Sequence, residues 1–352
     1  MSDSEQQNGQ AGQPAKADEF KKTSGWARPM AMAKDSNFYA WLGFLGLICL
    51  VIALWGPISR AYWKVRNREI ERTKEIPRTA NCFLAVSYEG ISHLPDPSGR
   101  YISTDAFRAH LMALIGAGYH PIGLQDICDF YYDKKLLPEK AILLTFENTR
   151  KSTYFESRPI LEELNWRAVM GVVTKKVSSW DSDVILRPYL KTMALDARWD
   201  LASESHEGTD FIVVSPQGRK AAFFSSLMWQ AENSRYESIA DFKDRIENDH
   251  KAALAEFEGK LGTKPLAFFF PLGNYGQFEQ SNRLLREANL EAVARHYKLG
   301  FILNNQALNE VNSDPRRLNR ATIAPDMTPE ELVALLDSAW PFKSNEALAK
   351  PL

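Results

Sequence analysis

The sequence is poor in cysteine and has almost no net charge. Only three of its 352 residues are cysteine, and no two of them form the Cys-x-x-Cys pair of zinc ribbons and thioredoxin-like sites. Basic and acidic residues nearly balance, which leaves a formal charge of −1. No basic stripe interleaved with aromatic residues is present. These absences argue against a zinc ribbon, a thioredoxin-like site and a nucleic-acid-binding surface.

Two of the cysteines, Cys82 and Cys128, lie in the part of the chain that we expect to fold. A disulfide between them would require an oxidising compartment. Two small buried apolar side chains would suit any compartment and are the simpler interpretation. Both alternatives stay open at this point.

Charged residues are missing altogether from residues 36–59. The core of this stretch, from Phe38 to Ile58, is apolar, and about 20 such residues at a rise of 1.5 Å cross a hydrocarbon layer of about 30 Å. The stretch starts too late and is too long for a signal peptide, and it lacks a small-x-small cleavage site. We therefore predict a permanent transmembrane helix over residues 36–59.

Basic residues flank this helix on both sides. They precede it (Lys16, Lys21, Lys22, Arg28 and Lys34) and follow it (Arg60, Lys64, Arg66, Arg68, Arg72 and Lys74). The positive-inside rule therefore does not determine the orientation, and the local density of charge slightly disfavours export of the following domain.

The remaining chain divides by composition. Residues 1–35 are rich in Gln, Ser, Gly, Ala and Lys, which predicts a disordered tail. Residues 60–79 are predicted to form a charged helical stalk. We expect one folded domain over residues 80–342 and a short tail over residues 343–352.

Strands and helices alternate from about residue 80 onward. Continuous apolar runs at residues 82–88, 141–146 and 168–174 are typical of strands buried on both faces of a parallel sheet. A long amphipathic helix is predicted over residues 238–261. Repeated units of this kind predict an α/β fold with a parallel sheet, either open or closed into a barrel. Functional side chains are then expected at the carboxyl ends of the strands.

Several segments between residues 82 and 340 carry a family resemblance as an ordered set. They include AVSYEGI, LPEKAILLTFENT, WDLASESHEG, PLAFFFPLGNYG and DPRRLNR. In this order they resemble the polysaccharide deacetylase family (carbohydrate esterase family 4, the NodB-homology domain). The similarity is greatest to its exopolysaccharide, poly-N-acetylglucosamine branch.

The resemblance implies a fold and a chemistry. The implied fold is a distorted (β/α) barrel of about seven strands, here preceded by one transmembrane helix. The implied site holds a divalent, zinc-like metal on one Asp and two His, and a second Asp acts as the base. Such a metal polarises the acetamide carbonyl and lowers the pKa of its bound water, whose proton the base accepts.

This sequence departs from the family at each of those positions. The base and the metal-binding Asp are replaced by Glu147 and Asn148, and the two metal-binding His by Glu204 and Gly208. Zinc generally needs three protein ligands besides water, and Gly208 has no side chain. We therefore predict no resident cofactor and the loss of ordinary metal-dependent deacetylation, with Glu147 in a degenerate base position. Whether the chain is an enzyme stays open.

Three alternatives remain for the mouth of the barrel. Glu89, which replaces a family His, would face the same mouth as Glu147 and Glu204, and paired carboxylates there could hydrolyse a glycosidic bond. The same acids could instead bind a cationic sugar. A rearranged metal site could use Glu147 and Glu204 with His206, next to the degenerate ligand position of Asn148.

Four residues are predicted to contact a sugar at this mouth. Glu89 and Pro271 lie in segments that resemble the family motifs, and the rings of Tyr88 and Tyr275 could stack on sugar rings. Ordinary packing in the core or at the rim is the alternative for each ring.

The resemblance favours a membrane-anchored protein that binds or acts on a cell-surface exopolysaccharide. Its partners would be an acetylated or aminated glycan, the membrane through residues 36–59, and exopolysaccharide-export proteins, without nucleic acid. The expected location is the bacterial inner membrane, with a single pass and the main domain in the periplasm. An active carbohydrate hydrolase, either an N-deacetylase with altered ligands or a Glu-based glycosidase, is the alternative.

Overall fold

The chain divides into two compact units, residues 1–59 and 60–352, and each is described by itself. The computed structural model describes residues 36–68, 70, 76–94, 96, 98–177, 182–277 and 282–341. The two predicted tails, residues 1–35 and 343–352, lie outside the described residues.

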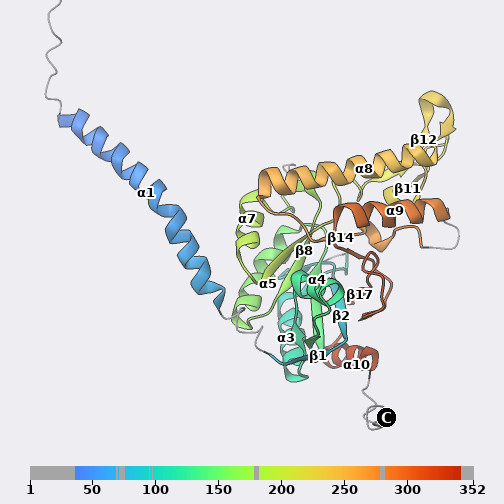
Figure 1. Cartoon of the computed structure of the whole chain (residues 1–352), viewed down its shortest axis with the longest axis horizontal. Helices are drawn as coiled ribbons and strands as arrows, with labels where there is room; N and C mark the ends of the chain where they lie inside the picture. The colour runs from blue at the N-terminus through green and yellow to red at the C-terminus, as the bar shows by residue number, and fades with distance from the viewer. Residues whose placement is uncertain are drawn as a thin grey trace, which may run out of the picture. The chain divides into compact units, whose positions relative to one another are not determined.

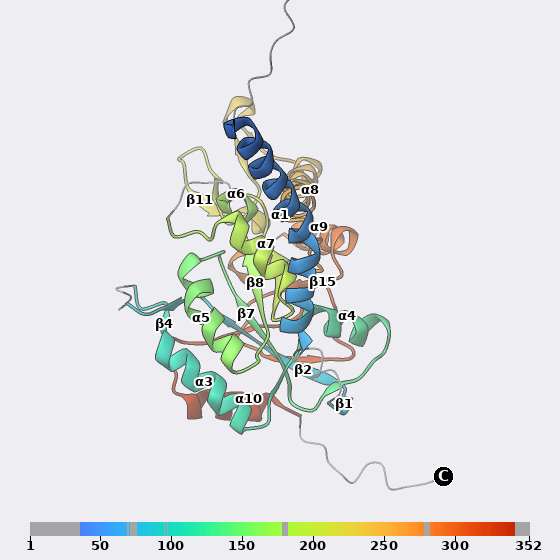
Figure 2. The ribbon, with the colours of Figure 1, turned by 90° about the vertical axis from the view of Figure 1, so that its left-hand side faces the viewer.

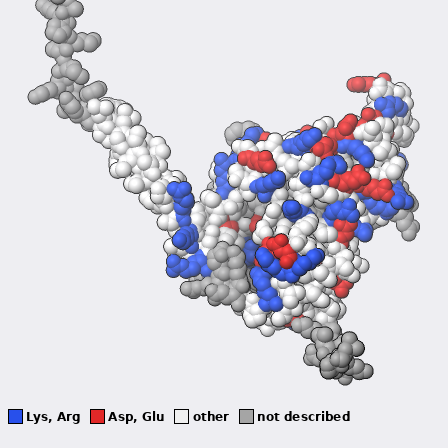
Figure 3. All heavy atoms as spheres, viewed as in Figure 1, with Lys and Arg blue, Asp and Glu red and all other residues white. Residues whose placement is uncertain are grey.

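Helix α1 (Ser36–Arg66) contains the predicted membrane span. Its segment Ala40–Arg66 is long and apolar enough to cross a membrane, and its most apolar window is fully exposed with a mean hydropathy of 2.2. Figure 3 shows a helix body without charged side chains, followed by Lys and Arg side chains toward the carboxyl end. The predicted stalk is helical up to Arg66, and its last residues belong to strand β1 (Arg78–Ala80).

The second unit is built on one curled, mainly parallel sheet. Its path is β15-β14-β9-β8-β7-β2-β16, and β5 and β17 pair beside β7 and β2. The strands are β2 (Cys82–Tyr88), β5 (His120–Pro121), β7 (Ala141–Phe146), β8 (Ala168–Val172), β9 (Trp199–Ser203), β14 (Ala267–Phe269), β15 (Leu299–Phe301), β16 (Leu308–Glu310) and β17 (Ala321–Thr322). Only β16 runs antiparallel to its neighbour among these described strands. The predicted α/β fold with a distorted barrel of about seven strands is confirmed.

Helices cover this sheet, and small ribbons lie at its edges. The helices are α3 (Thr104–Gly116), α4 (Leu124–Tyr132), α5 (Lys151–Glu163), α6 (Thr174–Val177), α7 (Arg187–Leu195), α8 (Ile239–Glu256), α9 (Arg283–His296) and α10 (Pro329–Ala339). The two-stranded ribbons are β1 with β6 (Leu137–Pro138), β3 (Ile91–Ser92) with β4 (Ile102–Ser103), β10 (Phe211–Val213) with β11 (Lys220–Ala222), and β12 (Trp229–Gln230) with β13 (Arg235–Tyr236). Helices α8 and α9 pack side by side, while α5 and α7 lie on the side of the sheet that faces the viewer in Figure 2 (Figures 1 and 2).

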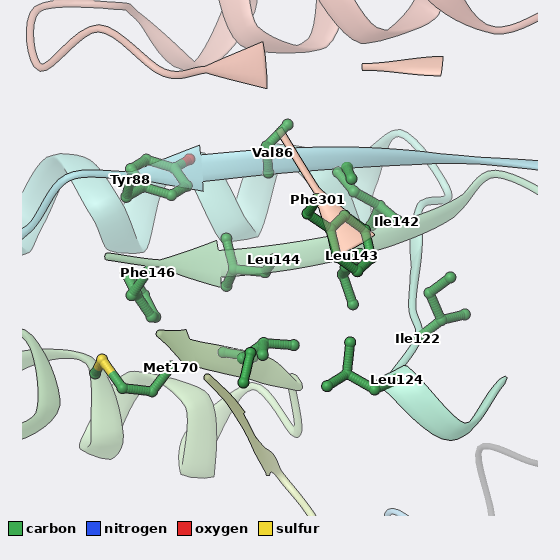
Figure 4. Close-up of a cluster of buried hydrophobic side chains, with 14 of the residues drawn as sticks. Val86, Tyr88, Ile122, Leu124, Ile142, Leu143, Leu144, Phe146, Met170 and Phe301 are labelled. Carbon is green, nitrogen blue, oxygen red and sulfur yellow. The ribbon is translucent and has the colours of Figure 1, made fainter. Parts of the chain in front are cut away.

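Strands β2 and β7 form the centre of the core because both are apolar along their whole length. They pair in parallel, with Leu84 opposite Ile142 and Tyr88 opposite Phe146, and every residue of both strands is buried. Figure 4 shows side chains of these strands packed together with those of neighbouring elements. Each fully buried aliphatic side chain contributes about 1.5–3 kcal/mol, so these two strands anchor the positions of the residues that follow them.

The long predicted helix over residues 238–261 is confirmed as α8, which one π-helical turn (Phe257–Leu261) extends. Its start is fixed by a capping box, in which Ser238 accepts from the amide of Asp241 and Asp241 accepts from the amide of Ser238. This cap fixes the residue at which the helix begins.

The two cysteines of the second unit are both buried, and neither forms a disulfide. Cys82 begins β2, and Cys128 lies within α4. They act as small apolar side chains, which is the simpler of the two interpretations of the sequence.

Candidate functional site

Two of the predicted site residues meet at the carboxyl ends of neighbouring parallel strands. Glu147 follows the last residue of β7, and Glu204 follows the last residue of β9, with β8 between them. Both side chains are buried, with exposed fractions of 5% and 1%. The end of a parallel sheet is where such folds place functional groups, so these two carboxyl groups form the core of the candidate site.

Arg320 holds the carboxylate of Glu147. Its guanidinium forms an ion pair with Oε1 of Glu147, which also accepts a hydrogen bond of 3.0 Å from the Ser87 hydroxyl. Arg320 is fully buried and lies over the ring of Phe269, 3.9 Å from its centroid. Its Nε and Nη2 have no hydrogen-bond partner within the described part of the chain. The sequence analysis did not assign a role to Arg320, although it is the last residue of the DPRRLNR segment that resembles the family.

Glu204 has the opposite electrostatic environment. Its Oε2 accepts a hydrogen bond of 2.7 Å from the backbone amide of Asn148. Burial, together with the nearby charge of Glu147, raises the pKa of Glu204 to about 8. A Cβ atom on Gly171 would lie 2.8 Å from the same oxygen, so a glycine in β8 makes room for this carboxyl group.

The turn that carries Glu147 adopts a left-handed backbone. Asn148 has φ 65° and Thr149 has φ 55°, which is unfavourable for a β-branched residue. Thr149 is held there because its hydroxyl donates to Gly171 O and accepts from the amide of Val173 at 2.7 Å. Strain of about 1–3 kcal/mol in such turns is common at functional sites and is offset by contacts of this kind. The turn places the backbone N–H of Asn148 within hydrogen-bond distance of Oε2 of Glu204.

The position that resembles the second metal-binding His is closed. A Cβ atom on Gly208 would lie only 2.1 Å from the ring of Phe224, which is itself buried. No side chain larger than glycine fits at this position unless Phe224 moves. The structure thus explains why a glycine stands where the family has a ligand.

His206 does not join the two glutamates in a metal site. Its Nδ1 lies 2.9 Å from the Thr174 hydroxyl, and its backbone amide donates to the carboxylate of Asp249 in α8. It lines a cavity of about 720 Å³ beside α8 that neither Glu147 nor Glu204 lines. Among the residues that the structure describes, no three His, Cys, Asp or Glu side chains are placed to hold a metal together. The side chains present therefore do not fit the zinc-like ion that the resemblance implies.

The predicted sugar-binding residues are mostly packed in the interior. Tyr88 is buried at the end of β2, and its hydroxyl lies 2.9 Å from Nδ1 of His110, so its ring is not free to stack on a sugar. Pro271 and Tyr275 are also buried. Glu89 is partly exposed and forms an ion pair of 2.8 Å with Arg100. Tyr88 is buried because it ends β2, whose continuous apolar run is covered on both faces, whereas Tyr275 lies outside the strands and packs against the ring of Phe270.

The chain matches no family model, but it is similar to characterised proteins in sequence. It is 26% identical over 241 residues to the poly-beta-1,6-N-acetyl-D-glucosamine N-deacetylase of Escherichia coli O157:H7, and equally to that of Escherichia coli K12. The matched region covers 64% of this chain and 34% of each relative. The chain thus spans about a third of the length of the curated relatives that it matches.

Solved structures show the same fold. A de-N-acetylase from Aggregatibacter actinomycetemcomitans superposes with a TM-score of 0.62 at 19% identity, over 72% of this chain and 99% of that one. The BpsB deacetylase domain from Bordetella bronchiseptica gives 0.57 at 23% identity, over 70% and 97%. IcaB from Ammonifex degensii gives 0.55 at 19% identity, over 73% and 98%. The sequence similarity confirms the resemblance to polysaccharide deacetylases, and the solved structures show that the fold is shared.

Proposed function

We propose that this chain is a membrane-anchored protein of the deacetylase fold that binds an exopolysaccharide of the N-acetylglucosamine type without ordinary metal-dependent deacetylation. The sequence relatives are named for poly-β-1,6-N-acetylglucosamine, which supports this class of glycan. The apolar helix α1 supports the anchor.

One observation carries the proposal. None of the three inherited metal positions keeps the side chain that the family uses there. Asn148 has a neutral side chain and its backbone N–H donates to Glu204, while Phe224 fills the space that a side chain at Gly208 would need. Only Glu204 retains an ionisable side chain among the three positions, and a buried carboxyl group with a raised pKa is a poor ligand because metal binding requires the deprotonated form.

The location and partners are part of the same proposal. A glycan of this type is exported, so the second unit would act in the periplasm of a bacterium with α1 in the inner membrane. Export proteins for the polymer would be its neighbours. The sequence similarity to poly-β-1,6-N-acetylglucosamine N-deacetylases supports this location, whereas the flanking basic residues do not determine it.

The test uses the purified full chain, produced with zinc in the medium. We expect much less than one metal ion per chain by elemental analysis and no acetate release from acetylated β-1,6-linked glucosamine oligomers. Binding of the same oligomers should remain measurable by calorimetry. Two results together would overturn the proposal: one bound ion per chain, and acetate release that is abolished by Glu147→Ala. The control Glu232→Ala, at an exposed position, should leave such acetate release unchanged. Absence of glycan binding would overturn its binding part.

An active hydrolase is the second candidate, and the environment of the two glutamates favours it. Burial keeps Glu204 protonated at neutral pH, while Glu147 forms an ion pair with Arg320. A protonated acid near a carboxylate is the arrangement that glycosidases use. Release of reducing ends from the oligomer, lost in both Glu204→Gln and Glu147→Gln, would support this candidate. Intact oligomer after prolonged incubation would exclude it.

A further inference from the structure

A second cavity lies at the opposite end of the sheet, where the strands begin. It has a volume of about 670 Å³ and is lined by Leu266 before β14, by Lys298 before β15, and by Tyr132 at the end of α4. Neither Glu147 nor Glu204 lines it. The cavity is therefore separate from the candidate site, which lies at the carboxyl ends of the strands.

Positive charge dominates the lining of this cavity. Four Lys and Arg side chains line it, against one carboxylate, that of Asp314. Arg316 is neutralised by two hydrogen bonds of 2.9 Å to Asp314, and Arg295 pairs with Glu247 at 3.1 Å. The remaining two lysines have no carboxylate partner in the described part of the chain.

These two lysines are Lys264 and Lys298, and both are exposed. The ammonium of Lys298 lies 5.3 Å from the ring centroid of Tyr132, whose hydroxyl donates to Lys298 O at 2.7 Å. The ring thus fixes the second lysine at the wall of the cavity. Two uncompensated ammonium groups around a hollow of this size are suited to an anion with several acceptor oxygens.

The first residues of the second unit lie at the same end of the sheet. Asn67 donates to Leu195 O at 3.0 Å and accepts from the amide of Ala197 at 3.1 Å, just before β9. Arg66 forms ion pairs with Glu162, at the end of α5, and with Asp196. The strands β9, β14 and β15 are adjacent and parallel, so the chain enters at the sheet end that carries the basic cavity.

We propose that this cavity binds the phosphate of an anionic phospholipid headgroup. The apolar segment Ala40–Arg66 is long enough to hold the chain at a bilayer, and the two free lysines supply the charge. Basic residues near an anionic bilayer surface each strengthen binding roughly fivefold. This site is independent of the glycan site and of any hydrolysis there.

The experiment measures binding to the full chain in a neutral detergent by calorimetry. The probes are short-chain phosphatidylglycerol, short-chain phosphatidylcholine and inorganic phosphate. Lys264→Gln/Lys298→Gln removes the two free charges. Lys220→Gln/Lys243→Gln removes two exposed lysines that do not line the cavity. Circular dichroism confirms that each variant is folded.

We expect phosphatidylglycerol to bind the wild-type chain and the control variant equally, and the cavity variant about 30-fold more weakly. Phosphatidylcholine should bind weakly to all three. Equal affinity in all three chains, or no binding at all, would overturn the proposal. Lysine-dependent binding of inorganic phosphate without binding of phosphatidylglycerol would overturn the lipid as the source of the phosphate.

Discussion

At the scale of single residues, the ion pair between Glu147 and Arg320 is the most consequential contact of the site. Both groups are buried, so each depends on the other for its charge to be tolerated. Removal of one partner leaves an uncompensated buried charge, which typically costs about 3–5 kcal/mol, whereas replacement of both is much less costly.

We therefore expect Arg320→Met to lower the free energy of unfolding by about 3–5 kcal/mol. The double variant Arg320→Met/Glu147→Gln should recover most of this loss, because no charge is left buried. Urea unfolding of the three chains checks this. A double variant as unstable as the single one would show that Arg320 acts through packing on Phe269 and not through Glu147.

The raised pKa of Glu204 predicts that the stability of the fold depends on pH. Its pKa is about 8 in the folded chain and near the ordinary 4.5 when unfolded, so folding takes up a proton between these values. The raised pKa therefore lowers the free energy of unfolding. This loss is absent below pH 4.5, grows as the pH rises, and reaches its full value above pH 8. Glu204→Gln removes it and should raise the free energy of unfolding by about 3 kcal/mol at pH 7, with little change at pH 4. Thermal unfolding across this range checks it, and an equal gain at pH 4 and pH 7 would contradict it.

At the scale of elements, the loop after β9 and the short helix η2 (Phe223–Ser225) compete for one space. Phe224 fills the place that a side chain at position 208 would need. Restoring the family ligands by Asn148→Asp, Glu204→His and Gly208→His should therefore fail to create a metal site, because the imidazole at position 208 meets the ring of Phe224.

Adding Phe224→Ala to those three changes removes the nearest obstacle, and the backbone at position 208 needs only a small shift from the Cβ of Ser205, 2.9 Å from the built Cβ. We expect zinc to bind only the fourfold variant, measured as metal per chain after removal of free ions. The control is the stability of the fourfold variant, measured by calorimetry with and without zinc. Truncation of a buried Phe lowers the free energy of unfolding by about 3–5 kcal/mol, and bound metal should restore part of this loss. Stoichiometric zinc in the threefold variant would show that Phe224 is not the obstacle.

Much of the element order could be predicted from the sequence, because β2, β7 and β8 are continuous apolar runs and α8 has a clear amphipathic period. The convergence of Glu147 and Glu204 also follows from their positions just after parallel strands. Two features could not be predicted in this way. The contact of Phe224 with Gly208 joins a loop to a separate short helix, and the role of Arg320 depends on a pairing over a long sequence separation.

At the scale of the whole molecule, α1 and the second unit can be tested separately. Full-length protein should stay with the membrane fraction in high salt and alkaline carbonate and be released only by detergent, because α1 is long and apolar enough to span. A chain that begins at residue 60 should be recovered without detergent. Release of the full-length chain by salt alone would contradict the span.

The start of the soluble fragment matters for its stability. Residues 60–70 belong to the second unit, where Asn67 and Arg66 contact the segment before β9. A fragment that begins at residue 60 keeps these contacts, and one that begins at residue 76 loses them. We expect the shorter fragment to melt several degrees lower, since the loss of even 1 kcal/mol is visible in a domain of this size. Equal melting temperatures would show that these contacts do not stabilise the unit.

The ring of Phe224 also determines which substitutions position 208 tolerates. It occupies the volume that a larger side chain at this position would need, and it contributes to a buried aromatic cluster. An imidazole introduced alone would collide with this packed interior, and removal of the ring alone would leave a cavity. Positions 208 and 224 are therefore coupled: each single change is unfavourable, and a ligand side chain at position 208 needs a smaller residue at position 224.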